Sequence, residues 1–330
     1  MKFLAVLGLG VVLVVGAVRM GAGQEKKAFI VRNDTEGPRV MAGGGLLDIL
    51  SRYGFSVSGV DAVKLTPAEE KEYGDWNRDA LESRHISRFV SAHRQNEGLH
   101  IGLLTNCVDL LGMLAGLQNL GLPVSSGGAK EQSIPRDGLA GLKPLRVGLV
   151  YLDAHADFNT PETTLSGMLG GMDVAVAAGL CLTRLRLKSG LDPALPTRYI
   201  VMGGLRDVDP LEQDLLDRSD VEFLSVDDLR RTFGEIDRQM DRLGRLTDVI
   251  YVHIDMDVLD PFEVRGHSMS VPQGPTSREL AAALERMFRN PKAEAIGIAS
   301  LPFGERDKEG VSLKAAYLLI EGALKGYASR

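Results

Sequence analysis

Three residues with metal-binding side chains, Asp153, His155 and Asp157, stand at alternate positions directly after an apolar segment. That segment, residues 147–152, has the composition of a buried strand. Alternate side chains of an extended chain point to the same side, so the three can converge just past the strand end. A polar turn that caps the strand is the alternative interpretation, but it leaves a histidine between two carboxylates unexplained. The pattern favours a metal site where open α/β sheets carry their ligands.

A second segment repeats this arrangement about a hundred residues later. Residues 249–254 are again strand-like and lead into Asp255 and Asp257, which share one side of the chain. Four carboxylates at two strand ends would repel one another and raise each other's pKa values. Two divalent cations remove that repulsion, and carboxylate with imidazole suits Mn²⁺ or a similar metal. Such a pair can lower the pKa of a shared water and promote hydrolysis.

Strand-like and helix-like segments alternate along the chain, and this alternation indicates the element types that must position the ligands. Strands are expected at 28–31, 55–60, 100–104, 147–152, 197–202, 222–225, 249–254 and 293–299. Helices are expected at 46–53, 78–95, 107–120, 173–188, 226–243, 277–289 and 312–327. Turns or loops are expected at 33–38 and 121–144, and a loop or short helix at 67–76. The predicted fold class is α/β, a three-layer α/β/α arrangement with a central, mostly parallel sheet.

Composition limits the classes of partner. The net charge of −6 argues against nucleic acid or anionic membrane. A hydrophobic content of 44% over 330 residues is enough for one large core, so a single domain is expected over 24–330. The two cysteines, Cys107 and Cys181, are not expected to pair.

Residues 1–23 have the pattern of a secretory signal peptide. Lys2 precedes an apolar run, residues 4–18, and small residues then lead to a polar sequence. Export to a secreted or periplasmic location is therefore predicted. An uncleaved membrane anchor is the alternative, although the run is short for a membrane span.

The motif Asp-Ala-His-x-Asp-x-Asn-Thr at 153–160, with Asp-x-Asp-x-x-Asp-Pro at 255–261, resembles the ureohydrolase superfamily of arginases, agmatinases and formimidoylglutamases. The resemblance extends from about residue 29 to the C-terminus. It implies an arginase-like fold, two Mn²⁺ per chain and hydrolysis of a linear amidine, at a guanidino or related C–N bond of an amino-acid-like substrate. The implied partners are a small-molecule substrate and further copies of the chain in a homo-oligomer. Neither nucleic acid nor a stable membrane span after leader removal is expected.

The resemblance also implies a role for each ligand. Asp153 and Asp255 would bridge the two metals. Asp157 would bind one metal and accept a hydrogen bond from the attacking hydroxide, which makes it the catalytic residue. His155 and Asp257 would bind the other metal.

Cys107 occupies the position of the family's sixth metal ligand, the histidine of a Gly-Gly-Asp-His element. The matching segment here is residues 104–107. A thiolate at a helix N-terminus has a lowered pKa and can bind metal, yet it is softer than Mn²⁺ prefers. A small buried thiol that binds no metal is the equally open alternative.

Two further positions depart from arginases. In place of the family's Ser-Gly-Asn-x-His, this chain carries Met168 for the asparagine and Gly170 for the proton-shuttling histidine. His253 and His267 are candidates to replace that imidazole, although His253 is expected to pack in the core.

Ala299 stands where arginases hold the substrate guanidinium with the glutamate of Glu-Val-Asn-Pro. A cationic head group would lose its principal counter-charge there. Glu305 lies close in sequence and is a candidate to supply it.

The residues that would bind the carboxylate and α-amino groups of a substrate match the family pattern better. Asn159 and Ser166 match positions that bind a substrate carboxylate, and Asp209 matches the residue that receives an α-amino group. Asp209 also reads as a helix N-cap before Pro210. Arg206 with Asp207 is expected to form a structural ion pair.

Two hypotheses about function remain open. The first is a binuclear metallohydrolase of linear amidines. The alternative is a catalytically impaired relative that acts as a metal-binding or ligand-binding protein. Clustered carboxylates favour the enzyme, since such clusters usually mark function.

Overall fold

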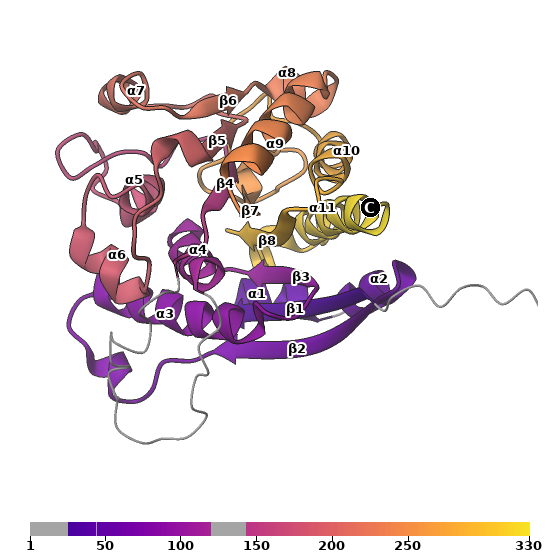
Figure 1. The fold of residues 1–330 in the computed structure, drawn as a ribbon, viewed down its shortest axis with the longest axis horizontal. Helices are drawn as coiled ribbons and strands as arrows, with labels where there is room; N and C mark the ends of the chain where they lie inside the picture. The colour runs from indigo at the N-terminus through magenta and orange to yellow at the C-terminus, as the bar shows by residue number, and fades with distance from the viewer. Residues whose placement is uncertain (1–25, 44, 120–142) are drawn as a thin grey trace, which may run out of the picture.

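The structure, a computed structural model, describes residues 26–43, 45–119 and 143–330 (Figure 1). The predicted signal peptide lies outside these residues, as does most of the predicted 121–144 loop. Export therefore stays a prediction. Within the described part of the chain, no helix combines the length and apolarity that crossing a membrane requires.

Eight strands form one sheet in the order β2-β1-β3-β8-β7-β4-β5-β6, and every neighbouring pair is parallel. Their bounds are β1 Lys26–Asn33, β2 Phe55–Val63, β3 Leu99–Leu103, β4 Val147–Leu152, β5 Ile200–Gly203, β6 Glu222–Leu224, β7 Val249–Asp255 and β8 Ala293–Ala299. The α/β prediction is confirmed, and the sheet is parallel throughout the described residues. All residues of β3, β4 and β7 are buried, as continuous apolar runs in the middle of a parallel sheet require.

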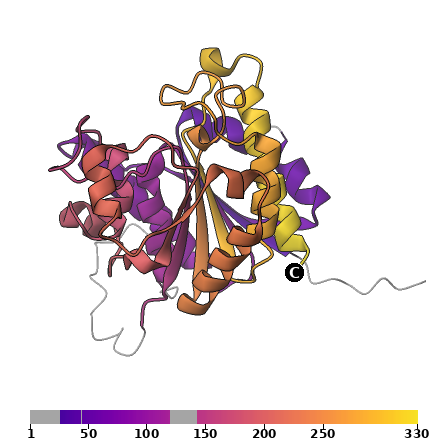
Figure 2. The same cartoon turned by 90° about the horizontal axis from the view of Figure 1, so that it is seen from above.

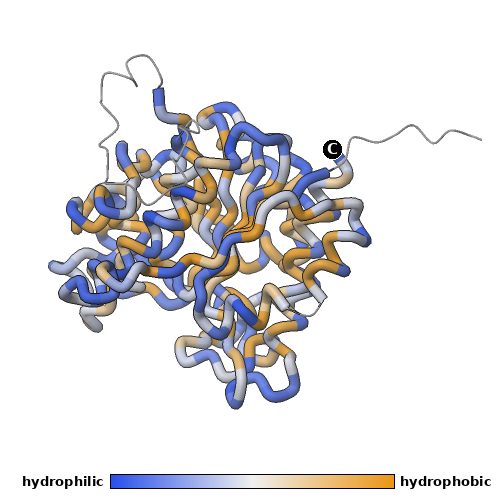
Figure 3. Tube along the Cα trace, turned by 90° about the horizontal axis from the view of Figure 1, so that it is seen from below, coloured by the Kyte–Doolittle hydropathy of each residue, from blue (hydrophilic) through white to orange (hydrophobic). Residues whose placement is uncertain are grey.

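Helices cover both faces of the sheet (Figure 2). One apolar core packs under α1 Glu36–Ala42, α2 Leu46–Arg52, α8 Val226–Arg230, α9 Gly234–Leu246, α10 Ser277–Met287 and α11 Val311–Ala328. The other packs under α3 Asp75–His93, α4 Leu110–Gln118, α5 Asp173–Ala177, α6 Thr183–Ser189 and α7 Pro210–Leu216. The tube view shows hydrophobic segments along the central strands and hydrophilic segments around the outside (Figure 3). This is the predicted three-layer arrangement.

The strand order brings four strand ends together. β3 and β4 follow each other in the chain, yet β8 and β7 lie between them in the sheet. The connections after neighbouring central strands therefore run toward opposite sides of the sheet. Such a reversal leaves a crevice at the carboxyl ends of the strands. The segments that follow β3, β8, β7 and β4 all meet at this crevice.

Two predicted helices are each divided in the structure. The helix expected at 173–188 breaks after α5, where Gly179 adopts a φ of 78° and the chain turns before α6. The helix expected at 226–243 ends early because the Thr232 hydroxyl donates to the Asp227 carbonyl and to the Asp228 carboxylate. A side chain that bonds the local backbone in this way competes with helix continuation.

The segment predicted as a turn, residues 33–38, also contains the start of a helix. α1 begins at Glu36, and Pro38 lies in its first turn, where a missing N–H costs nothing.

Helix α4 lies against α3 at a distance that only glycine permits. A Cβ added at Gly112 would lie 2.3 Å from the Ser83 carbonyl oxygen, and one at Gly116 would lie 2.5 Å from the Val90 Cβ. Both glycines are in α4, which continues from the turn that carries Cys107. The close packing of these helices therefore fixes the β3 side of the crevice.

Gly112→Ala should lower the free energy of unfolding by about 1–3 kcal/mol, because backbone atoms have to move to admit a methyl group. Gly234→Ala, at the start of α9, is the matched control, since a Cβ there meets nothing within 4 Å. Urea denaturation of both variants measures the difference. Equal stabilities of the two variants would contradict the close contact between α3 and α4.

Candidate metal centre

A cavity of about 460 Å³ lies at the carboxyl ends of β3, β8, β7 and β4. Every residue that the sequence predicted for the site lines it: Cys107, Asp153, His155, Asp157, Asn159, Ser166, Asp209, Asp255 and Asp257. The structure therefore brings together side chains that lie up to 150 positions apart in the sequence.

The segment after β4 holds its carboxylates through its own backbone and through Tyr151. The His155 N–H donates to Oδ1 of Asp153 at 2.7 Å. The Tyr151 hydroxyl lies 2.9 Å from Oδ2 of Asp153 and 2.5 Å from Oδ2 of Asp157. A phenol has one proton, so the two carboxylates share a single donor and each is only partly compensated by it. Asp157 has a φ of 46°, and its carbonyl accepts from the N–H groups of Val174 and Ala175.

The segment after β7 places Asp255 at the centre of the cluster. Asp255 accepts from the Asp257 N–H at 2.8 Å and from the Ser300 hydroxyl at 2.5 Å. The Cys107 thiol donates to Oδ2 of Asp255 at 2.9 Å, the same oxygen that accepts from Ser300. Asp257 in turn accepts from the Ala154 N–H at 3.2 Å, which ties the β7 segment to the β4 segment.

Arg206 fixes the backbone around this cluster. Its guanidinium donates to the carbonyls of Gly204, Asp257, Leu259, Val271 and Pro272. The predicted structural role is therefore present, but the predicted partner is wrong. Arg206 binds backbone oxygens, whereas Asp207 lies 3.8 Å from Nε2 of His155. A planar guanidinium with five donors suits such a set of carbonyls better than a single carboxylate does.

His155 stands between two carboxylates. Its Nδ1 lies 3.3 Å from Asp153 and 3.1 Å from Asp257. Burial opposes protonation, but the hydrogen bonds to both carboxylates outweigh it and raise the pKa of His155 to about 11. A positive charge is thus strongly favoured at this point between the two carboxylates.

The carboxyl groups are themselves difficult to ionise. Burial and the charge of Asp257 raise the pKa of Asp255 to about 6, and burial and Asp153 raise that of Asp257 to about 6. Burial and Asp153 raise the pKa of Asp157 well above its usual range. Without a cation, the cluster therefore retains protons that free carboxyl groups would lose.

The predicted lowering of the Cys107 pKa is wrong. Asn106 and Asp109 form a capping box around the short 3₁₀ turn Cys107–Asp109, so the thiol does lie at a helical N-terminus. Burial, together with the charges of Asp255 and Asp173, nevertheless raises the pKa of the Cys107 thiol well above its ordinary value. A coordinated cation would have to displace the thiol proton.

The donor set fits two divalent cations. Ligand atoms of Cys107, Asp153 and Asp255 lie within 4.8 Å of one another, as do those of Asp153, His155 and Asp257. Asp153 belongs to both groups, as expected of a bridging ligand. Burial and mutual charge raise the pKa values of Asp255 and Asp257, and cations would replace the protons that these groups retain.

The predicted substrate-binding residues form one wall of the cavity. The Asn159 amide donates to Asp209 at 3.1 Å. Ser166 accepts from the Met168 N–H at 3.2 Å. Asp209 also caps α7 in a capping box with Glu212, so its alternative structural interpretation is present alongside its place in the cavity.

The structure also shows where the positions that differ from the arginase pattern lie. Gly170 and Met168 line the cavity, and a Cβ at Gly170 would meet nothing within 4 Å. Ala299 is fully buried at the end of β8. Glu305 does not supply the missing charge, because its exposed carboxylate pairs with Lys308.

His253 packs in the core as expected, although only one ring nitrogen is paired. Nδ1 lies 2.7 Å from the Tyr251 hydroxyl, while Nε2 has no partner within the described residues. The ring stacks on Tyr151. Burial lowers the pKa of His253 to about 3, so it remains neutral.

Sequence reasoning missed several contributors. Tyr151 and Ser300 donate hydrogen bonds directly to the carboxylates. In the sequence, nothing distinguishes either position from an ordinary apolar or small one. Asp173 reads as a helix N-terminal acid. His267, which the sequence offered only as a nearby candidate, comes from a long loop and lies 3.6 Å from Asp255. Only its isolated position among small and polar residues, 266–270, hinted at such a role.

The metal-free protein should lose stability as the pH rises. A carboxyl group with a raised pKa binds its proton more tightly when folded, so the stability it contributes is full below its unfolded pKa of about 4. That stability is lost as the pH passes through about 6 for Asp255 and Asp257. His155 acts in the same direction at higher pH, up to about 11.

The melting temperature of chelator-treated protein should therefore be several degrees lower at about pH 8 than at about pH 5. Saturating Mn²⁺ should reduce or reverse the difference, because metal binds the deprotonated ligands. A chelated protein that is more stable at the higher pH would show that the carboxylates are already compensated within the chain.

Comparisons with known proteins agree with this geometry. The sequence model of the Arginase family matches residues 113–300, more than half of the chain. The chain is 27% identical over 274 residues to the arginase of Bacillus caldovelox, covering 82% of this chain and 83% of that protein. It is 33% identical over 151 residues to the N(omega)-hydroxy-L-arginine amidinohydrolase of Streptomyces lavendulae, covering 46% and 49% of the two chains.

The fold is similar to that of a solved structure. The crystal structure of arginase from Bacillus cereus superposes with a TM-score of 0.74 at 19% identity, over 91% of this chain and 98% of that one. The matched segment 113–300 contains all the ligands placed above except Cys107. This chain belongs to the arginase family.

Proposed function

We propose that this protein is a binuclear metallohydrolase that cleaves a C–N bond of a linear amidine carried by an amino-acid-like substrate. The observation that carries the proposal is the sharing of ligands between neighbouring groups. Asp153 joins the Cys107 group to the His155 group, and ligand atoms of Asp255 and Asp257, one from each group, also lie within 4.8 Å of each other. Carboxylates shared in this way would hold two cations next to each other, where both could polarise one water.

Two divalent cations, when bound, lower the pKa of water and supply a nucleophile near neutral pH. The protein's own residues do the rest. Asp153 and Asp255, at the ends of β4 and β7, would hold both cations. Asp157, held by Tyr151 and by the backbone of α5, is in position to orient the attacking water and to accept its proton.

The amino-acid end of the substrate is proposed to bind at Asn159, Ser166 and Asp209. An amide and a hydroxyl can donate to a carboxylate, and Asp209 can accept from an α-amino group. Two relatives that match about four-fifths of this chain are arginases, whose substrate carries both groups.

The head group that suits this cavity is less cationic than a guanidinium. Ala299 brings no carboxylate to the end of β8, and Arg306 lines the cavity from the next turn. A guanidinium held next to Arg306 would lack a counter-charge and be repelled. An N-hydroxylated guanidine is less basic, and one relative bears that substrate in its name.

His267 is proposed to provide the imidazole that is absent at position 170. Of the described residues that line the cavity, two are histidines, and His155 is the other. Nδ1 of His267 accepts from the Met269 N–H at 3.3 Å, so Nε2 is the free nitrogen and lies 3.6 Å from Asp255. It can therefore deliver a proton to a leaving amine beside the metal centre.

The second candidate function is a relative that binds metal or ligand without turnover. Gly170, Ala299 and Cys107 favour it, because each replaces a group that arginases use. The two candidates differ in one respect: both bind metal, but only the enzyme releases product.

The proposed function predicts two metals per chain and metal-dependent hydrolysis. Chelated protein reloaded with Mn²⁺ or Co²⁺ should hydrolyse Nω-hydroxy-L-arginine faster than L-arginine, and agmatine, which lacks the α-carboxylate, should be poorer still. Asp153→Asn should lose metal and at least about 10²-fold in rate. Asp207→Asn is the matched control, since Asp207 lines the cavity but belongs to no ligand group.

Two bound metals with no turnover of any amidine would favour the non-catalytic relative. Fewer than two metals at saturation would exclude the binuclear mechanism altogether.

His267→Gln should lower kcat by about 10²-fold or more without changing the metal content, because general acid assistance is lost while the ligands stay. Gly170→His in the same background should restore part of the rate, since a side chain at position 170 meets open space. Gly170→Phe, which fills the same space without a proton, should not restore it. Loss of metal from His267→Gln would show instead that His267 is a ligand.

A further inference from the structure

A fifth buried carboxylate, Asp173, lies beside the proposed metal centre and has no role in the mechanism above. It is the first residue of α5 and has no exposed surface. Neither of its oxygens has a hydrogen-bond partner within the described residues. The Val174 N–H, which lies next to Asp173, donates to the Asp157 carbonyl at 3.0 Å. A buried carboxyl group without partners is strongly unfavourable unless something else compensates it.

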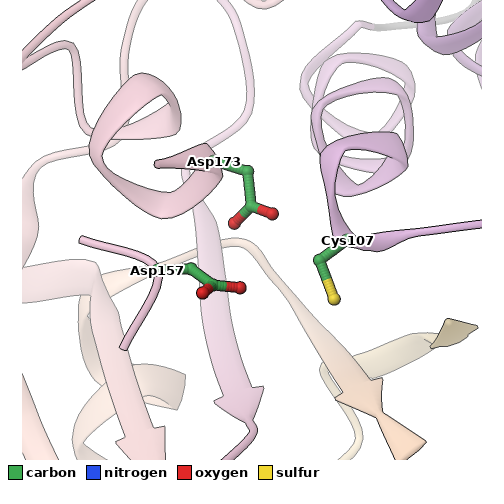
Figure 4. Close-up of side chains that lie close together, drawn as sticks. All are labelled: Cys107, Asp157 and Asp173. Carbon is green, nitrogen blue, oxygen red and sulfur yellow. The ribbon is translucent and has the colours of Figure 1, made fainter. Parts of the chain in front are cut away.

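The Asp173 carboxylate points at two residues of the metal centre. Figure 4 shows the side chains of Asp173, Asp157 and Cys107 directed into one shared space from three separate segments. Ligand atoms of the three lie within 4.8 Å of one another. This group is distinct from the His155 group, with which it shares no residue.

The backbone holds Asp173 in this place. The N–H groups of Val174 and Ala175 both donate to the Asp157 carbonyl, so α5 begins directly on the ligand segment. The Met172 N–H donates to the Leu169 carbonyl, and α5 itself is buried. The carboxylate therefore cannot move out to solvent without breaking packed structure, and burial with the charges of Asp153 and Asp255 raises its pKa well above the usual range.

We propose that Asp173 is a direct ligand of the cation on the Cys107 side of the centre. It would complete a set of one thiolate and two terminal carboxylates, from Cys107, Asp157 and Asp173, next to the bridging Asp153 and Asp255. This inference rests on the proposed function, because it assigns a ligand to one of the two cations. The cation would thereby compensate a buried carboxylate that has no hydrogen-bond partner among the described residues.

The same set predicts a metal preference. A thiolate is a soft ligand and favours Zn²⁺ or Co²⁺ over Mn²⁺, whereas the carboxylate and imidazole set around His155 accepts Mn²⁺. The two halves of the centre should therefore differ in metal preference, and Zn²⁺ or Co²⁺ should fill the Cys107 side before Mn²⁺ does.

Cobalt binding tests the assignment directly, because a Co²⁺–thiolate bond gives a charge-transfer absorption in the near ultraviolet. Titration of chelated wild-type protein with Co²⁺ should show two sites, one of which produces this band. Asp173→Asn should lower the Co²⁺ affinity of the band-producing site by at least about 10-fold. Loss of a residue that only hydrogen-bonds a metal ligand already lowers metal affinity by about that much. Cys107→Ser should remove the band.

Asp257→Asn is the matched control, since Asp257 belongs to the His155 group. It should weaken the other site and leave the band-producing site at wild-type affinity. Unchanged affinity in Asp173→Asn, with two sites present in the wild type, would overturn the Asp173 assignment and leave the proposed function intact. Absence of Co²⁺ binding by the wild type would overturn the proposed function itself.

Thermal melting separates ligand loss from misfolding. In chelator, Asp173→Asn should melt at or above the wild-type temperature, because the substitution removes an unpartnered buried carboxyl group. With Co²⁺, the order should reverse, because the wild type gains more from the bound metal. A variant that melts lower in both conditions would contradict a role for Asp173 as a ligand and indicate a structural one.

Discussion

Mutual repulsion among buried carboxyl groups is the main physical constraint on the structure at the carboxyl ends of the central strands. Asp153, Asp157, Asp255 and Asp257 lie at two adjacent strand ends, and burial alone would make each hard to ionise. Among the described residues, His155, backbone N–H groups and hydroxyl or thiol donors compensate these carboxylates in part. Divalent cations would compensate such a cluster, and in the function proposed above the same cations would supply the hydrolytic chemistry.

The parallel sheet is what allows this concentration of charge. Four neighbouring parallel strands, β3, β8, β7 and β4, have their carboxyl ends on the same side of the molecule. Their apolar residues form part of a buried core on each face of the sheet. The ligand segments are fixed to one another by backbone contacts, including those of Arg206 and of the α5 N–H groups to Asp157. Because helices α3 and α4 pack through glycine, the Cys107 side is fixed as firmly as the others. The site is therefore preorganised by packing and not by the ligands alone.

The sequence predicted those parts of the structure that leave a local signal. The apolar runs before Asp153 and Asp255 identified β4 and β7, and alternate spacing identified which side chains share a side. The strand alternation gave the layers correctly. Helix interruptions at Gly179 and Thr232 were not predicted, because helical periodicity continues across them while local backbone chemistry ends the helix.

The remaining site residues depend on tertiary contacts that no spacing reveals. Asp173 has the sequence context of an ordinary helix N-terminal acid, and only the contact of α5 with the Asp157 carbonyl places it at the centre. His267 comes from a loop whose path is set by contacts with distant segments. The direction of the Cys107 pKa shift was mispredicted for a related reason: helix position is local, whereas the surrounding carboxylates that outweigh it are not.

Anomalous X-ray diffraction from crystals grown with Co²⁺ would test the central claim most directly. The account predicts two anomalous peaks, separated by about 3.5–4 Å as in other two-metal sites. One peak should lie among Cys107, Asp157 and Asp173, the other beside His155 and Asp257, with Asp153 and Asp255 between them. No peak at the strand ends, with His155 still held between Asp153 and Asp257, would contradict it, because the carboxylates would then be compensated by protons and imidazolium alone.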